Sequence, residues 1–432
     1  MWGYWLFFAL ESLLVHVMLP AEELAMSDGA YIALIFINSL VLVFLLSRKY
    51  RHDGNFVVLI IGGFLFRLFL MFWSEYFSHV FTLPNSGADE MTYYYNAMST
   101  LVKDKEFTGY ALLFSWQARV FGLSKLYGKF VNILFSISAI TILRRILIRL
   151  NMDRNVRTRT LAFACFLPNF AILSALLLRE SIIIFLIAVS AFYILRWWQE
   201  DRIRYLLFSL LASVGAAWLH SGIVAYTVGL LCVAVSTRRT PDGHKFKLLS
   251  LRTLIFSAVT AAAVLVVLMN VDMGLTSYFR DADSLEDIVS IADAYEDGGS
   301  SYNANIVGND STVGFIINTP FRMFYFMFAP VPWNWRSATD IIAFVFSALF
   351  YGYVFIKTMA YAAKSHRFSF GSALFLIALL VLMMFGWGVS NSGTALRHRD
   401  KMVIHYLIMY ALIQSENGQS KRQQIRSYSD EI

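Results

Sequence analysis

Charged residues and cysteines are both scarce in this sequence of 432 residues. Charged residues make up 15% of the chain, whereas a soluble domain carries about 25%. Hydrophobic residues make up 58%. The two cysteines, Cys165 and Cys232, lie in apolar stretches and supply neither a disulfide framework nor the spacing of a zinc site. The composition excludes a soluble globular protein and a disulfide-stabilised secreted one.

Three further features are missing from the sequence. The N-terminus lacks the basic segment and the small-residue cleavage site of an ordinary cleavable signal peptide. No Rossmann or P-loop glycine pattern is present, so no site for a soluble nucleotide sugar is expected. No internal repeat of the kind found in transporters is visible.

Stretches of about 20 mostly apolar residues recur along the whole chain, and each is long enough to cross a bilayer as a helix. Aromatic residues make up 16% of the chain, as expected where Trp and Tyr line the headgroup zones. We therefore predict an all-α, polytopic membrane helix bundle of about twelve transmembrane helices, with eleven and thirteen as alternatives. The predicted spans are 3–20, 30–47, 55–73, 126–147, 160–177, 181–196, 205–219, 222–236, 253–270, 338–356, 369–388 and 402–415. They form one membrane domain, 1–415, followed by a polar tail, 416–432.

The basic residues predict the orientation of the bundle. Alternate loops hold 23 of the 36 Lys and Arg residues but only eight Asp and Glu residues. These loops are 48–54, 144–159, 196–204, 237–252, 357–367 and the tail 416–432. The positive-inside rule places them in the cytoplasm together with both termini.

Two long segments, 74–125 and 271–337, are predicted to lie on the outer side. The second contains an acidic run from Asp281 to Asp297, followed by a Gly-Ser stretch and by the apolar segment 313–330. The alternation of sides implies that 313–330 does not cross the bilayer, so we predict a re-entrant or interfacial helix there. Such a helix requires protein around its broken backbone. A thirteenth span is the alternative.

Four polar motifs fall on the predicted outer face, where ionisable groups are costly and therefore mark function. The first is Asp89-Glu90, a pair that suits a general base or a divalent-cation site or, alternatively, an ordinary acidic helix start. Tyr93 and Tyr94 follow the pair and suit stacking on sugar faces. The second motif, Arg179-Glu180, lies between two apolar spans, where it would either clamp a phosphate or close a hairpin as an ion pair.

The third and fourth motifs contain histidine. His220 lies at a tight hairpin and suits either proton transfer or a capping role. The fourth motif, Asn391 to Lys401, includes Arg397, His398 and Arg399. Its cations and the glycine before them suit a phosphate at a helix N-terminus, and anchoring to lipid headgroups is the alternative.

A Pro/Trp-rich segment completes the predicted site. Trp333 and Trp335 lie in it and suit glycan stacking, and Arg322 and Arg336 flank it. Arg67 lies deep in the third predicted span, where we expect it to be paired inside the bundle.

The acidic-plus-Tyr motif, the Leu-Arg-Glu-Ser hairpin, the Pro/Trp-rich segment and the terminal Gly-Thr-Ala-x-Arg-His-Arg motif together resemble one group of membrane enzymes. These are the Wzy-type repeat-unit polymerases of bacterial surface-polysaccharide clusters and the related C-type membrane glycosyltransferases. The resemblance covers the layout of nearly the whole chain and these short motifs.

The resemblance implies a glycosyltransferase at the outer face of the bacterial inner membrane. Its substrate would be a polyprenyl-linked glycan, and membrane lipid and other polysaccharide-assembly proteins would be its partners, without nucleic acid. The first expectation is a polymerase of O-antigen, capsule or exopolysaccharide. The alternatives are a C-type enzyme with a polyprenyl-monophosphate donor and a flippase for the same lipid-linked glycan. No cofactor is required by the motifs, although Asp89 and Glu90 could hold a divalent cation.

The implied roles divide the motif residues into three groups. The catalytic group is Asp89, Glu90 and His220. The phosphate-binding group is Arg179, Glu180, Arg322, Arg336, Arg397, His398 and Arg399. The glycan-stacking group is Tyr93, Tyr94, Trp333 and Trp335.

Overall fold

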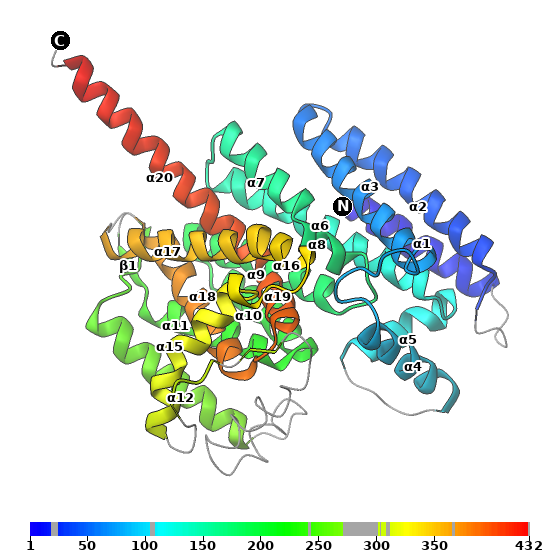
Figure 1. Cartoon of the computed structure of the whole chain (residues 1–432). Coiled ribbons are helices and arrows are strands. Elements are labelled where there is room, and N and C mark those ends of the chain that lie inside the picture. The colour runs from blue at the N-terminus through cyan, green and yellow to red at the C-terminus, as the bar shows by residue number, and fades with distance from the viewer. Residues whose placement is uncertain are drawn as a thin grey trace. The chain divides into compact units, whose positions relative to one another are not determined.

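The computed structural model describes residues 1–18, 25–103, 109–240, 243–270, 301–302, 304–307, 312–364 and 368–430. This part of the chain is helical apart from one two-stranded antiparallel sheet (Figure 1). The acidic run and the Gly-Ser stretch of the second outer segment lie outside the described residues, apart from Ser301. The all-α prediction is confirmed.

The helices and strands have the following bounds: α1 (Trp2–Met18), α2 (Asp28–Lys49), α3 (Gly54–Tyr76), α4 (Ala88–Lys103), α5 (Tyr110–Phe121), α6 (Lys125–Arg149), α7 (Arg154–Phe166), α8 (Pro168–Ser174), α9 (Glu180–Glu200), α10 (Ile203–Leu219), η1 (Ser221–Ile223), α11 (Val224–Ser236), β1 (Arg238–Thr240), β2 (Gly243–Lys245), α12 (Leu251–Asn270), α15 (Thr312–Phe328), η2 (Pro332–Asn334), α16 (Ala338–Ala343), η3 (Phe344–Ala348), α17 (Leu349–Lys364), α18 (Ser369–Gly388), α19 (Ser392–Asp400) and α20 (Val403–Asp430).

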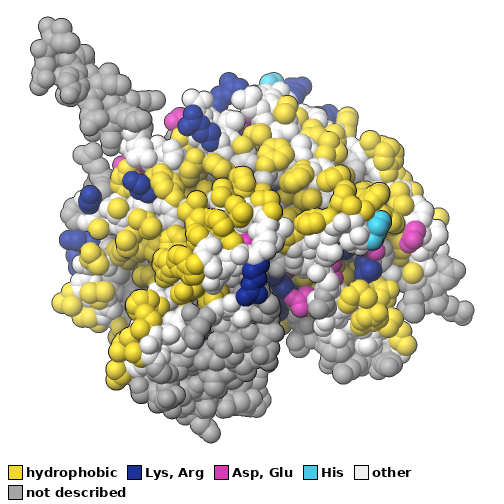
Figure 2. Space-filling view, viewed as in Figure 1, with side chains coloured by type: hydrophobic (Ala, Val, Ile, Leu, Met, Phe, Trp, Pro, Cys, Tyr) yellow, Lys and Arg dark blue, Asp and Glu magenta, His cyan; other side chains and the backbone are white. Residues whose placement is uncertain are grey.

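Within the part of the chain that the structure describes, six helical segments are long and apolar enough to cross a membrane: Asp28–Lys49, Gly54–Tyr76, Lys125–Arg149, Glu180–Glu200, Ala338–Lys364 and Ser369–Gly388. Four shorter apolar helices, at Trp2–Met18, Ile203–Leu219, Ser221–Ser236 and Leu251–Thr260, coincide with further predicted spans. Figure 2 shows a broad expanse of exposed apolar side chains on the visible face, as a protein surrounded by lipid requires. The chain is a helical membrane protein, and the full set of twelve spans stays a prediction.

The predicted span 160–177 is interrupted in the structure. α7 ends at Phe166, and Leu167 takes an extended backbone conformation before α8 begins at Pro168. Proline lacks the N–H that would continue the helix, and it disfavours helical geometry in the residue before it. The segment 74–125, which is predicted to lie on the outer side, contains the two helices α4 and α5.

The helices group into two compact units, each with its own core. Unit 1 comprises 1–144 and 161–185, and unit 2 comprises 145–160 and 186–432. In unit 1, α3 packs closely on the end of α7, since a Cβ atom added at Gly63 would lie 2.8 Å from the Cβ of Cys165. In unit 2, α11 packs on α18, and α15 lies against the same helix through Met323 and Gly386.

The two ends of unit 2 carry different side chains. At one end, the β1–β2 hairpin docks on the end of α9, where Asp201 accepts from Arg239 at 2.6 Å and lies 3.0 Å from His244 Nε2. At the opposite end, η1, α19 and the last turns of α15 and α18 come together. The segment 301–307 joins this second end, because Tyr302 N donates to Ser390 O at 2.8 Å.

Candidate functional site

Two histidines from distant parts of the sequence meet at the second end of unit 2. His220 follows the last residue of α10, and His398 lies on α19. Their ring centroids are 4.7 Å apart and the rings are perpendicular. Phe385 of α18 packs edge-on against both rings, at 5.5 and 4.5 Å. The sequence predicted that both histidines belong to the site, and the structure brings them together.

The hydrogen bonds of the two imidazoles define which nitrogen carries the proton. Gly222 N donates to His220 Nδ1 at 3.2 Å, and the Lys401 ammonium lies 3.1 Å from His398 Nδ1. A backbone N–H and an ammonium are donors only, so both Nδ1 atoms accept, and each neutral ring carries its proton on Nε2. Each ring therefore carries one N–H donor on Nε2, and donors of this kind suit an anion.

The cations around this pair differ in burial. The Lys401 side chain is fully buried and lies 5.6 Å from the Phe385 ring centroid, whereas Arg397 is half-buried. α19 begins at Asn391, whose side chain accepts from Gly393 N and Thr394 N at 2.9 and 3.3 Å. The backbone N–H groups of Gly393 and Thr394, at the helix N-terminus where the sequence predicted a phosphate, thus already donate to a side chain of the protein.

Arg399 lies on α19, before the predicted span 402–415 begins, and its side chain is buried in the protein interior. Its guanidinium donates to Phe326 O at 2.6 Å, to Met327 O at 2.7 Å and to Ala329 O at 2.5 Å. These carbonyls belong to the last turn of α15 and the residue after it, where the partial negative charge of the helix favours a cation. Burial lowers the pKa of Arg399 to about 10, so the side chain stays charged at neutral pH.

Arg322 makes a second contact of this kind. Its Nε donates to Asn305 Oδ1 at 2.8 Å and its Nη1 to Trp387 O at 3.1 Å, in the last turn of α18. Arg322 and Arg399 were predicted as phosphate ligands, and the structure shows both holding the ends of helices.

The Pro/Trp-rich segment is more open than the histidine pair. Trp333 and Arg336 are exposed, and Trp335 is half-buried and donates to Pro330 O at 3.0 Å. The backbone N of Arg336 donates to Asp340 Oδ2 at 2.8 Å.

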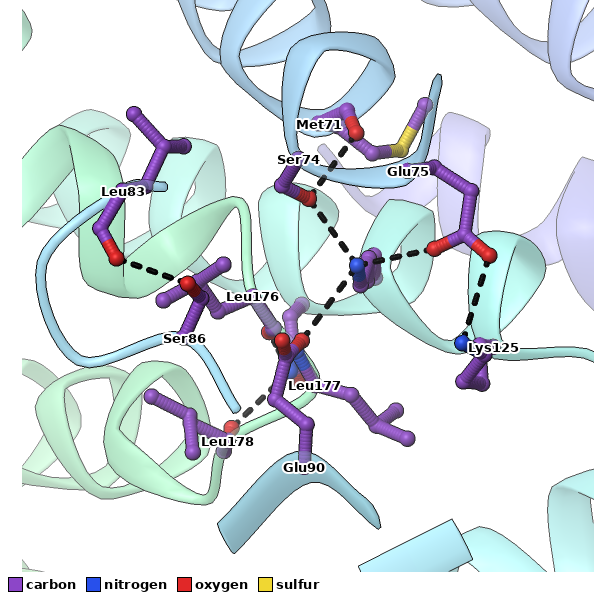
Figure 3. A network of polar contacts seen from close by, with 12 residues as sticks. Met71, Ser74, Glu75, Leu83, Ser86, Glu90, Lys125, Leu176, Leu177 and Leu178 are labelled. Atoms are coloured by element: carbon purple, nitrogen blue, oxygen red, sulfur yellow. Dashed lines mark hydrogen bonds and ion pairs between the residues drawn. The ribbon is translucent and has the colours of Figure 1, made fainter. Parts of the chain in front are cut away.

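Unit 1 contains a separate polar network, which Figure 3 shows from close by. The buried ammonium of Lys129 on α6 lies 2.9 Å from Glu75 Oε2, 2.9 Å from Ser74 Oγ and 3.4 Å from Glu90 Oε1. Lys125 lies 3.5 Å from Glu75. Glu90 is buried while its neighbour Asp89 is exposed, so the predicted acidic pair is divided between two environments.

The same network holds the chain between α8 and α9. Leu177 N donates to Glu90 Oε1 at 2.7 Å. The Asn132 amide donates to Leu176 O and Leu178 O, each at 2.8 Å, and to Tyr110 OH at 3.0 Å. This backbone is neither helix nor strand, so the side chains supply the hydrogen bonds that water would provide elsewhere.

The remaining predicted residues of unit 1 surround this turn. Tyr93 packs on the buried leucines of the turn and lies 5.0 Å from Tyr110, ring to ring. Tyr94 is half-buried and lies edge-on to Tyr95. Arg179 is half-buried and Glu180 is fully buried at the start of α9.

Sequence reasoning missed Lys129, Asn132 and Glu75. A lysine and an asparagine inside the apolar stretch 126–147 were the available signal, because such groups are costly in a membrane and need partners. Among the described residues, no group of three or more His, Cys, Asp or Glu residues could hold a metal ion.

The chain was compared with known proteins in three ways. No model of a protein family, no curated protein and no solved structure matches it.

Proposed function

We propose that the chain is a membrane glycosyltransferase that moves a glycan from a polyprenyl-phosphate or polyprenyl-pyrophosphate carrier, first of all as a repeat-unit polymerase. The observation that carries the proposal is the group of donors around His220 and His398. It combines two imidazole Nε2–H groups with the cation Lys401, and Arg397 precedes His398 on α19. All of these groups favour an anion, and none of them is a carboxylate.

A carrier phosphate is the anion that suits this position. His220, His398 and Phe385 lie where α10, α18 and α19 end or begin, which is where the headgroup of a membrane-embedded lipid would be presented. In glycan transfer, the acceptor hydroxyl attacks the anomeric carbon, the bond from that carbon to the phosphate oxygen breaks, and the phosphate gains negative charge. Donors that are in place before this charge develops lower the barrier.

The acceptor hydroxyl must lose a proton in this reaction, and the two imidazoles are poor candidates to take it. Each Nδ1 lone pair is already engaged and each Nε2 carries a hydrogen. The base predicted from the sequence is the acidic pair of unit 1, of which Asp89 is exposed on the first turn of α4. Glu90 is less suitable, since Lys129 and Leu177 N already bond to its carboxylate.

The flippase alternative predicts charged groups along the path of the substrate through the bundle. The donors named here gather at one end of unit 2, which favours an enzyme that receives its substrate at the membrane surface. The proposed localisation is the outer face of a bacterial inner membrane, with both termini in the cytoplasm.

The proposal is tested by replacing His398 with alanine and Arg397 with lysine in cells at matched membrane abundance. His398→Ala removes one donor, and Arg397→Lys keeps the charge but loses the planar fork that binds phosphate in a bidentate manner. Both variants should shorten or abolish the surface glycan and accumulate lipid-linked units. Arg119→Lys, at an exposed cation on α5 in the predicted outer segment 74–125, is the matched control and should leave the glycan unchanged. Full-length glycan in both variants would remove this site from the mechanism.

A further inference from the structure

A buried carboxyl group in α1 belongs to neither of the sites described above. Glu11 lies about halfway along this helix, which coincides with the predicted span 3–20. The opposite face of α1 is apolar and exposed, with side chains at positions 2, 6, 10, 13, 14 and 17, as a face toward lipid requires. Glu11 therefore points away from lipid and into unit 1.

The carboxyl group of Glu11 is held by an amide instead of a cation. Asn38 Nδ2 on α2 donates to both carboxyl oxygens, at 2.8 and 2.6 Å, and to Leu34 O at 3.0 Å. Tyr4 OH donates to Asn38 Oδ1 at 2.8 Å. Because a carbonyl oxygen such as Leu34 O accepts only, the Asn38 amide must turn its NH₂ group toward Glu11.

Glu11 forms no ion pair with any residue that the structure describes. The helices packed against α1 contribute few titratable groups near it. Two phenol groups, those of Tyr4 and Tyr127, interact electrostatically with it. Further titratable groups on these helices include Tyr31 on α2, Arg119 on α5, and Lys125 and Lys129 on α6, both of which pair with Glu75. On α1 itself, His16 contacts Arg119 O at 3.3 Å.

The hydroxyl of Tyr127 interacts electrostatically with the carboxyl group of Glu11 but is not hydrogen-bonded to it. Its ring is fully buried on α6, and its OH has no hydrogen-bond partner among the described residues.

We propose that Glu11, held by Asn38, is a proton-binding site in the membrane-embedded part of unit 1, which is occupied by a proton at neutral pH. Burying a carboxylate without a cation costs far more than burying a neutral carboxyl group that keeps its hydrogen bonds. A metal cation would not replace the proton, since the NH₂ group of Asn38 faces the carboxyl oxygens and would repel it. The site binds and releases one proton, and it does not depend on the proposed transfer reaction.

Dicyclohexylcarbodiimide tests this site, because this apolar reagent modifies protonated carboxyl groups in apolar surroundings. The full-length protein in lipid nanodiscs is treated at neutral pH, and the modified peptides are identified by mass spectrometry. A water-exposed glutamic acid has a pKa of about 4.3 and is almost fully ionised under these conditions. We expect Glu11 to be modified, while Glu75, which is paired with Lys129 and Lys125, serves as the unmodified internal control.

Two variants sharpen the test. Glu11→Gln is nearly isosteric and should abolish the modification without changing the elution of the protein on size exclusion. Asn38→Lys places a cation beside the carboxyl group and should lower the modification at neutral pH at least about tenfold, since a near opposite charge favours the ionised form. An unmodified Glu11 at neutral pH would overturn the proposal, whether or not acidification restores the reaction. Equal modification in wild type and Asn38→Lys would overturn it as well.

Discussion

Replacement of Arg399 by lysine should destabilise the protein, whereas the same replacement at Arg397 should not. Arg399 reaches three carbonyl oxygens at 2.5–2.7 Å and is 3% exposed. A lysine ammonium at this place can satisfy one or two of these acceptors and leaves the others buried without a donor. Hydrogen bonds from charged donors contribute about 1.5–3 kcal/mol each, so we expect Arg399→Lys to cost about 2–4 kcal/mol of unfolding free energy.

The measurement is the free energy of unfolding in mixed micelles with increasing denaturing detergent, for the wild type and both lysine variants. Arg397 is half-buried on the same helix, and its replacement should change stability by no more than about 1 kcal/mol. Glycan length in cells then separates the roles. Arg397→Lys should lose polymer at normal stability, and Arg399→Lys should lose polymer in proportion to its lower abundance.

One result would refute this reasoning. If Arg399→Lys were as stable as the wild type and still lost all polymer at matched abundance, Arg399 would bind the substrate directly. The carbonyls of α15 would then be satisfied in another way.

Three further outcomes are expected. Gly63→Ala should cost about 1–3 kcal/mol of unfolding free energy, because the added Cβ would lie 2.8 Å from Cys165 Cβ. Gly54→Ala, whose added Cβ would have no atom within 4 Å, should not destabilise the protein. Equal stability of the two variants would show that α3 can move away from α7. Glu90→Gln should lower the unfolding free energy by about 1–3 kcal/mol, because it weakens the buried bonds of Glu90 to Lys129 and Leu177 N. Asp89→Asn should leave stability unchanged and abolish the polymer. Polymer formation by Asp89→Asn would exclude Asp89 as the base. Ser78→Cys should react with an impermeant thiol reagent in intact cells, and His52→Cys should not. Both positions are exposed in loops that are predicted on opposite sides of the membrane, and the native cysteines are buried. The reverse labelling pattern would invert the proposed orientation.

The helices could be predicted from the sequence because long apolar stretches bounded by polar residues carry a strong and local signal. The break at Leu167 was also within reach, since Pro168 lies inside the predicted span 160–177. The apolar composition of this stretch outweighs its single proline in a hydropathy profile. Hydropathy averages over a window and therefore does not register a single residue that lacks an N–H.

The site was less predictable because it depends on contacts between distant segments. His220 and His398 each stood out as a polar residue at a membrane boundary, but only packing against Phe385 shows that they face each other. Lys129 and Glu11 were overlooked because each is a single charge within an apolar stretch. Those are the positions at which a charge is most costly and most needs an explanation.

Three buried arginines among the described residues donate to the same kind of acceptor, a backbone carbonyl at the end of a helix. The pattern of charges in a sequence does not reveal this kind of acceptor. Arg67 donates to Cys165 O and Ala164 O at the end of α7, Arg399 to carbonyls at the end of α15, and Arg322 to one at the end of α18. None of these acceptors is a carboxylate.

A helix that ends inside the protein leaves up to four carbonyls without an intrahelical donor, and little water reaches them there. One guanidinium satisfies two or three of these carbonyls and matches the negative end of the helix dipole. An arginine in or beside an apolar span therefore indicates a helix that ends nearby as readily as it indicates an anionic ligand. In this chain, that distinction separates Arg322 and Arg399, which position helices, from Arg397, which we propose contacts the carrier phosphate.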